Sequence, residues 1–232
     1  MTNTLPNDCL DFNGNNPSLT YFRVRRIICI GRNYSEHAKE MGHDPEREAP
    51  FFFYKPLTSL FPVSPNNAQS RAWSMPHYSQ NVHHELEVAI AIGGKVTGNN
   101  PEQRIIGAGI ALDMTCRDVQ QQAKALKQPW ATAKGFDHAA PVSPLFETDW
   151  IKLQQIGDFT LTKNGHEVQR GNIAQMIWPI PALLLELSRF TQLDKGDLIL
   201  TGTPAGVSAV NKGDVLRAAI SQQNCALEIE IN

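Results

Sequence analysis

Residues 85–94 read ELEVAIAIGG, and this stretch decides the fold class. The residues that follow the two glutamates, VAIAI, are continuously apolar, which predicts a buried β-strand that ends at the glycine pair. Alternate residues of a strand face the same side. The carboxylates of Glu85 and Glu87 are therefore predicted to project together, while Leu86 and Val88 turn toward the core.

Further strand signals lie on both sides of this stretch, at residues 25–31, 51–56, 105–115, 158–169, 197–204, 214–220 and 226–231. An Asn164-Gly165 pair predicts a hairpin turn within the fourth of them. Helical patterns are fewer: 34–41, 117–127 and a buried helix that starts near Pro181. Strands and helices do not alternate regularly, so we predict an α+β fold, a mixed sheet curled into a roll or sandwich.

Length and charge limit the classes of function. The chain has 232 residues, which suits one domain, and we expect residues 1–20, rich in Asn and Pro, to form an irregular arm before a single domain over 21–232. The formal net charge is -2, so no basic excess favours binding to nucleic acid. The most apolar stretch, residues 176–187, is too short to span a membrane.

The N-terminus and the cysteines indicate a cytoplasmic location. The first residues lack the positive and apolar regions of a signal peptide. No CxxC pair occurs, which disfavours a cysteine zinc site. Cys29 and Cys116 lie within apolar runs and are predicted to be buried thiols, as suits a reducing compartment.

Three carboxylates form a candidate metal site. Asp113 lies at the end of the apolar run 105–115 and can close a site with Glu85 and Glu87. Carboxylates without cysteine suit a hard ion, Mg²⁺, Mn²⁺ or Ca²⁺, that keeps several waters. The alternative is a solvated strand face, and His83 or His84 is either a supporting donor or an additional ligand.

Six motifs in order resemble the fumarylacetoacetate hydrolase family, in particular its small single-domain branch of acylpyruvate hydrolases and oxaloacetate decarboxylases. They are GRNYSEHAKEMG, FYKP, HHELEVAI, LDMTCRDVQ, PWATAKGFD and GDLILTGTPAGV, and the resemblance runs from about residue 26 to the C-terminus. It implies a β-roll, a homodimer, a single catalytic domain, and Mg²⁺ or Mn²⁺ bound by Glu85, Glu87 and Asp113.

A histidine and a glutamate form a candidate catalytic pair. Asn33, as an N-cap, and Glu36 predict the start of the helix 34–41, on which His37 and Glu40 stand three residues apart and can meet. The pattern alone favours two surface residues on a charged helix, whereas the resemblance places the family's water-activating pair on them. We expect this short helix to act as a lid that orders around a ligand.

The remaining candidates contact the substrate. The resemblance places a substrate-binding lysine at Lys134, where positive charge can steady a developing enolate. Thr203, after a strand and Gly202, can bind a carboxylate, although a plain turn fits as well. Gln120, Arg32 and Lys55 complete the set, and Arg32 can equally be structural.

These features predict a divalent-metal-dependent enzyme that acts on a small 2-oxo acid. The leading hypothesis is hydrolysis of a C–C bond in an acylpyruvate of the fumarylpyruvate or acetylpyruvate type, through an enolate that the metal stabilises. Oxaloacetate decarboxylation and keto-enol tautomerisation share that intermediate and stay open. A non-enzymatic 2-oxo acid sensor is the rival from another class. A serine hydrolase is disfavoured because G-x-S-x-G is absent.

Overall fold

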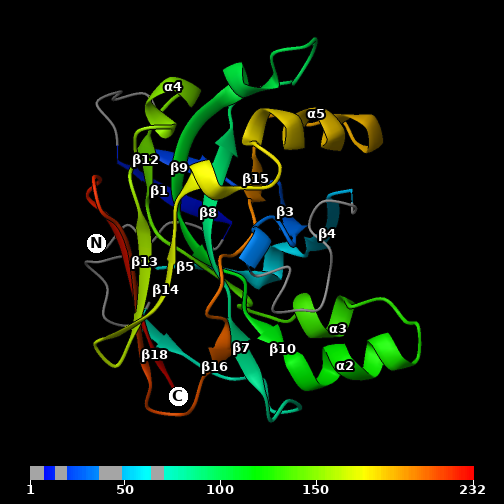
Figure 1. Cartoon of the computed structure of the whole chain (residues 1–232), viewed down its shortest axis with the longest axis vertical. Helices are drawn as coiled ribbons and strands as arrows, with labels where there is room; N and C mark the ends of the chain where they lie inside the picture. The colour runs from blue at the N-terminus through cyan, green and yellow to red at the C-terminus, as the bar shows by residue number, and fades with distance from the viewer. Residues whose placement is uncertain (1–7, 14–19, 37–48, 64–70) are drawn as a thin grey trace.

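The computed structural model describes residues 8–13, 20–36, 49–63 and 71–232, and within them the strands form three sheets (Figure 1). The large sheet has the order β2 (Tyr21–Arg23), β1 (Cys9–Asn13), β12 (Leu145–Glu147), β9 (Ile105–Leu112), β8 (Leu86–Ile92), β15 (Asp197–Leu200), β3 (Arg26–Gly31) and β4 (Phe51–Lys55). Two further strands join it, since β11 (Ala140–Val142) pairs with β9 and with β5 (Leu60–Pro62). Three of its pairings are parallel and the rest antiparallel, so the sheet is mixed.

The second sheet has the order β14 (His166–Gly171), β13 (Phe159–Lys163), β17 (Val215–Ile220), β18 (Cys225–Ile231) and β6 (Ala72–Trp73). The third is small: β10 (Thr115–Cys116), β7 (Val82–His84) and β16 (Ser208–Ala209). Its strands continue β9, β8 and β15 in the same lateral order. Three neighbouring strands therefore leave the large sheet together and enter the small one.

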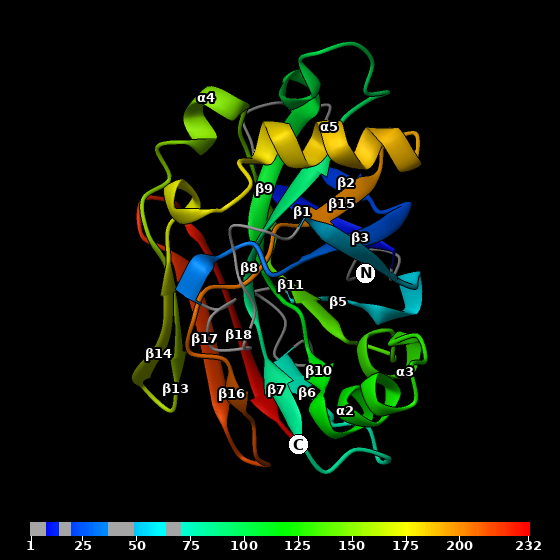
Figure 2. The same cartoon turned by 45° about the vertical axis from the view of Figure 1, so that its right-hand side comes forward.

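Helices are few and short among the described residues. They are α2 (Arg117–Ala125), α3 (Ala131–Lys134), α4 (Trp150–Leu153) and α5 (Ile180–Phe190), with 3-10 turns η1 (Leu57–Ser59), η3 (Pro101–Arg104) and η4 (Ile173–Gln175). Figure 2 shows α5 across one end of the sheets and α2 with α3 near the other. None of the helices described is long and apolar enough to cross a membrane.

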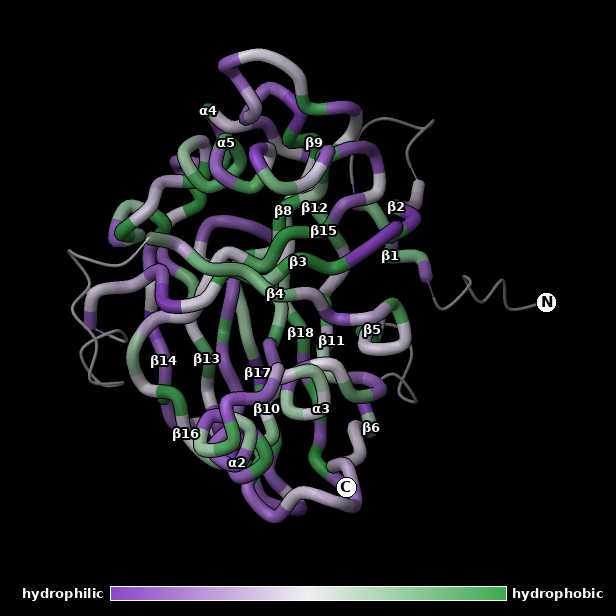
Figure 3. The backbone as a smooth tube through the Cα atoms, turned by 90° about the vertical axis from the view of Figure 1, so that its right-hand side faces the viewer, coloured by the Kyte–Doolittle hydropathy of each residue, from purple (hydrophilic) through white to green (hydrophobic). Residues whose placement is uncertain are grey.

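The core lies on both faces of the large sheet. Every residue of β8 is buried, with Val88 and Ile90 packed in one apolar cluster and Ala89 and Ala91 in another. The first cluster extends to Phe159 and the other apolar residues of the five-stranded sheet. Figure 3 shows the apolar colour concentrated in β8, β15 and β3, and polar colour along β14. Burial on both faces explains why this strand reads as a continuous apolar run.

The structure confirms the predicted α+β fold on mixed sheets, and it places strands at each predicted run. Asn164 and Gly165 both adopt positive φ at the turn of the β13–β14 hairpin, as the Asn-Gly pair predicts. All four cysteines are free and buried. The cytoplasmic location stays a prediction.

The expectation of an irregular arm is wrong for part of it. Residues 9–13 form β1, which pairs with β2 and, in parallel, with β12. Leu10 and Phe12 alternate with the more exposed Asp11 and Asn13, so they bury against the core once these partners are present. The pattern is too short to indicate a strand by itself.

Candidate active site

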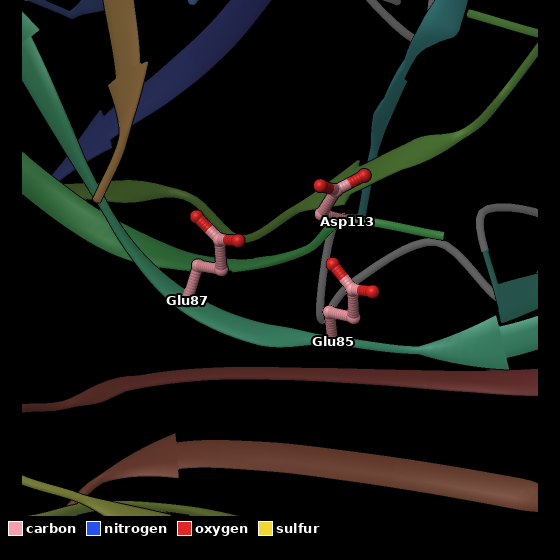
Figure 4. A group of neighbouring side chains, drawn as sticks. All are labelled: Glu85, Glu87 and Asp113. Carbon is pink, nitrogen blue, oxygen red and sulfur yellow. The ribbon is translucent and has the colours of Figure 1, made fainter. Parts of the chain in front are cut away.

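Strand register brings the three carboxylates together. In the antiparallel β8–β9 pair, Leu86 lies opposite Leu112, and Asp113 N–H donates to the carbonyl of Glu85 at 2.8 Å. Glu85 and Asp113 are thus cross-strand neighbours, and Glu87 lies two residues along the same face. One ligand atom from each lies within 4.8 Å of the other two (Figure 4). The prediction that these side chains converge agrees with this geometry.

The turn after β15 holds the carboxylate of Glu87. Gly202 N–H donates to Glu87 Oε2 at 2.7 Å, and Thr201 is anchored to the carbonyl of Val88 through its N–H and its hydroxyl. Gly202 has φ of 99°, and an added Cβ would lie 2.7 Å from the Cβ of Asn33. Only glycine fits this conformation in this space.

Three cations surround two of the carboxylates. Lys134 Nζ lies 2.7 Å from Glu85 Oε2 and 2.6 Å from Asp113 Oδ2, so it bridges them. Arg117 donates to the other oxygen of Glu85 at 2.5 Å. Lys55 Nζ forms an ion pair with Asp113 Oδ1 at 2.8 Å. Burial alone would lower the pKa of Lys134, but the Asp113 and Glu85 carboxylates outweigh it and raise the pKa, which keeps the ammonium charged.

The carboxylates fit a divalent cation. Glu87 is buried and, among the residues described, has no cationic side chain in an ion pair with it. Burial, followed by repulsion from Asp113, raises its pKa well above the ordinary value. Asp113 Oδ1 is buried and its only neighbour of opposite charge among the described residues is the Lys55 ammonium, at 2.8 Å. A charged Glu87 is therefore costly to bury unless a cation binds its oxygens.

A cavity of about 300 Å³ opens beside the carboxylates, a volume suited to a small metabolite. Four predicted contacts line it together with the metal triad: Arg32, Gln120, Lys134 and Thr203. Arg32 adopts φ of 57° and stacks on Phe51, with its guanidinium carbon 4.6 Å from the ring centroid. Phe51, Phe53 and Trp130 form an aromatic wall, with the Phe51 and Trp130 centroids 5.5 Å apart.

Other predicted residues lie elsewhere. Lys55 is outside the cavity lining and fully buried behind Asp113, where it also donates to the carbonyls of Met114 and Lys134. The prediction that it contacts the substrate does not match this place. Asn33 is not seen to cap a helix, because its side chain bonds to the backbone of Thr201 and Trp178. His37, Glu40 and most of the predicted lid helix lie outside the described residues.

His83 and His84, which precede Glu85 in the chain, are structural neighbours of the site. His84 Nδ1 lies 2.9 Å from Gln169 Oε1, and its Nε2 lies 2.9 Å from Ser208 Oγ. Burial lowers the pKa of His84 to about 4, and that of His83 also to about 4. Neither belongs to the carboxylate cluster found in the described chain.

Three site residues escaped the sequence analysis: Arg117, Lys124 and Gln169. The first two flank Gln120 on one helix, and the amphipathic spacing of α2 was the signal that could have found them. Gln169 carries no such signal. Its amide accepts from Leu86 N–H and donates to Thr203 Oγ1 and the carbonyl of Pro204, so it links β8 to the turn that bears Thr203.

Comparison with known proteins shows what the whole chain is similar to. The family model described as fumarylacetoacetate (FAA) hydrolase C-terminal matches residues 26–229. A mitochondrial oxaloacetate decarboxylase of Dictyostelium discoideum is 37% identical over 210 residues, covering 89% of this chain and 94% of that protein. An oxaloacetate tautomerase of Escherichia coli is 37% identical over 203 residues, covering 86% and 90%.

Similarity to a solved structure extends over nearly the whole chain. The crystal structure of fumarylpyruvate hydrolase from Pseudomonas aeruginosa, in complex with Mn²⁺ and pyruvate, superposes with a TM-score of 0.87 at 35% identity. The match covers 98% of this chain and 97% of that one.

Proposed function

Because the chain belongs to the fumarylacetoacetate hydrolase family, we propose that it is a divalent-metal-dependent enzyme that hydrolyses the C–C bond of small acylpyruvates. The observation that carries this proposal is the buried cluster of Glu85, Glu87 and Asp113 with Lys134 between two of them, at the side of a metabolite-sized cavity. The Mn²⁺ and pyruvate held by the similar fumarylpyruvate hydrolase support it, since pyruvate is one product of such a cleavage.

We propose Mg²⁺ or Mn²⁺ as the cation, with Glu85, Glu87 and Asp113 as its ligands. Three carboxylates are the ligand set of a hard cation. Such an ion, when bound, supplies Lewis-acid stabilisation of negative charge on the oxygen atoms of a 2-oxo acid. Lys55 and Arg117 orient the ligand carboxylates through their ion pairs, as supporting residues of metal sites commonly do.

In the proposed reaction, separate residues activate water, stabilise the enolate and bind the substrate. Glu40 orients His37, which takes a proton from water, and the water oxygen attacks the acyl carbonyl carbon, C4. The C3–C4 bond breaks, its electron pair stays on C3, and the enolate of pyruvate and a carboxylic acid result. Lys134 Nζ places positive charge beside the developing enolate, and return of the proton held by His37 to C3 completes pyruvate. Arg32, Gln120 and Thr203 hold the rest of the substrate.

Oxaloacetate is the second candidate substrate, favoured by the names of the decarboxylase and tautomerase relatives. Loss of CO₂ from oxaloacetate, or movement of a proton at C3, places negative charge where acylpyruvate cleavage places it. Neither reaction needs water to attack, so neither needs His37 and Glu40 as a water-activating pair.

Turnover on a substrate panel tests the proposal. Acetylpyruvate, fumarylpyruvate and oxaloacetate are assayed with Mg²⁺ and with EDTA, for the parent chain and for His37→Ala. We expect acylpyruvate cleavage that EDTA abolishes and that His37→Ala lowers by at least about a hundredfold. Binding without turnover would favour the sensor, and activity resistant to EDTA would contradict the metal site. Oxaloacetate turnover that alone survives His37→Ala would separate the two reactions.

We further propose that the chain works as a homodimer, as the family resemblance implies. Light scattering on the purified protein should give twice the chain mass of 25.8 kDa. A mass of one chain at micromolar concentration would contradict the dimer.

A further inference from the structure

Helix α2 lines the cavity with a polar stripe. Arg117, Gln120 and Lys124 are spaced by three and four residues, so they lie on one face of the helix, and all three line the cavity. Arg117 marks the inner end, because it contacts the metal ligand Glu85. Gln120 follows, bonded to Arg117 at 2.7 Å, and Lys124 stands at the outer end.

No acidic side chain of the described residues balances the charge at the outer end of this stripe. Arg117 and Lys134 both pair with carboxylates of the metal cluster. Lys124, by contrast, has no acidic partner in the part of the chain that the structure describes, and its ammonium rests 5.2 Å from the centroid of the Trp130 ring. Lys124 is exposed at the cavity mouth, where partial desolvation, followed by repulsion from Arg117 and Arg32, lowers its pKa. An anion bound here would relieve that repulsion.

We propose that Lys124 binds a carboxylate at the far end of the acyl group, so that the preferred substrates are acylpyruvates whose acyl chain ends in a carboxylate. The inference rests on the proposed function and adds to it a substrate class and a specificity-determining residue. The ammonium acts as a point charge on a flexible stem that can follow the end of the substrate.

The distances favour a long dicarboxylic substrate over a short one. The seven-residue offset between Arg117 and Lys124 corresponds to about 10 Å along the helix axis. Oxaloacetate separates its carboxyl carbons by only three bonds, which span roughly 4 Å. An acylpyruvate that ends in a four-carbon dicarboxylic unit separates them by six bonds, or roughly 8 Å, and the lysine side chain can close the remainder. The aromatic wall of Phe51, Phe53 and Trp130 offers a flat surface for an unsaturated chain between the two ends.

Two substrates of equal length test the role of Lys124. Fumarylpyruvate carries the distal carboxylate, and its analogue with a methyl group in that place does not. For Lys124→Met we expect kcat/KM on fumarylpyruvate to fall by at least about tenfold, mainly through KM, and kcat/KM on the methyl analogue to change less than about twofold. Lys124→Arg should retain most of the preference, and Lys124→Glu should reverse it.

Lys127→Met is the matched control. Lys127 is exposed just beyond the end of α2 but does not line the cavity, so its loss removes the same charge from the same region without the contact. A drop of equal size for both substrates in Lys124→Met, or an equal drop in Lys127→Met, would overturn the inference. A parent chain that cleaves both substrates with equal kcat/KM would also overturn it and leave the proposed function standing. A parent that cleaves no acylpyruvate would instead remove the proposed function.

Discussion

Single residues behind the carboxylates fix the positions of the carboxylate groups, and Lys55 is the clearest example. Its side chain is fully buried, pairs with Asp113 Oδ1 and donates to two backbone carbonyls. It therefore fixes one ligand of the proposed metal from the side away from the cavity. A lysine in this place is expected to orient the carboxylate rather than touch the substrate.

Lys55→Met separates these two roles. Breaking one side of a buried ion pair should lower the free energy of unfolding by about 3–5 kcal/mol, and metal affinity should fall about 10- to 100-fold. Urea unfolding measures the first effect, and Mn²⁺ titration by calorimetry the second. If the affinity for Mn²⁺ is unchanged while KM for the 2-oxo acid rises, Lys55 is a substrate contact after all. Lys152→Met, at an exposed lysine, is the control.

Gln169 links β8 to the turn that carries Thr203. Its buried amide accepts from Leu86 N–H and donates to Thr203 and to the carbonyl of Pro204. Gln169→Leu leaves these groups without partners, so we expect the free energy of unfolding to fall by about 3 kcal/mol. KM for the 2-oxo acid should rise as Thr203 loses its position.

Chemical denaturation and steady-state kinetics measure the two effects of Gln169→Leu. Gln121→Leu, on the exposed side of α2, is the matched control and should leave both quantities nearly unchanged. Wild-type KM in Gln169→Leu would show that Thr203 keeps its place without this amide, and would contradict the positioning role.

At the scale of elements, the site lies where three neighbouring strands change sheets. Glu85 separates β7 from β8, Asp113 follows β9 before β10, and the turn from Thr201 to Pro204 follows β15 before β16. The ladders of the large sheet end there, so Glu85 and Asp113 face the cavity and the backbone N–H of Gly202 is available to bond to Glu87. Because the site lies where the three strands pass from one sheet to the next, no separate loop is needed to position its residues.

The turn after β15 depends on its glycine. Gly202→Ala would place a Cβ 2.7 Å from Asn33 at a φ of 99°, and it would move the N–H that holds Glu87. The control is Gly213→Ala, because Gly213 has a similar φ of 89° but nothing within 4 Å of an added Cβ. In both variants, backbone strain should lower the free energy of unfolding by about 1–3 kcal/mol.

For Gly202→Ala alone, we expect the free energy of unfolding to fall by more than the strain accounts for, and we expect Mn²⁺ to bind more weakly. Thermal unfolding and Mn²⁺ titration of the two variants make the comparison. Equal losses of stability in both variants, with unchanged Mn²⁺ affinity, would contradict the proposed support of Glu87 by this turn.

The comparison of elements also shows what sequence can and cannot predict here. Strand β8 can be predicted from the sequence because burial on both faces leaves a continuous apolar run. The two-residue period of a strand then places Glu85 and Glu87 on one face. Strand β1 cannot be predicted from the sequence, since its five residues become a strand only through pairing with β2 and β12. Gln169 lies 83 residues from Leu86, and no local pattern records a contact at that separation.

At the scale of the whole molecule, the proposed metal ion joins parts of the chain that are distant in sequence. Its ligands come from β8 and from the residues at the ends of β8 and β9, and the partners of those ligands come from α2, α3, β4 and the turn after β15. A ligand that binds only the folded state stabilises it by mass action. Metal should therefore raise the stability of the entire domain and not only that of the site.

Thermal unfolding with and without metal makes this measurable. Mn²⁺ at about 100 times its Kd should add about 2.7 kcal/mol, which for a chain of this size raises Tm by roughly 5–10 °C relative to EDTA. Glu87→Gln removes the ligand whose buried charge lacks an ion pair, so this variant should show little response to Mn²⁺ and a Tm in EDTA at or above that of the parent. Glu230→Gln, on the exposed face of β18, should respond as the parent does. A parent Tm that is the same in Mn²⁺ and EDTA would contradict the metal centre, because three buried carboxylates cannot bind a cation tightly without stabilising the fold that gathers them.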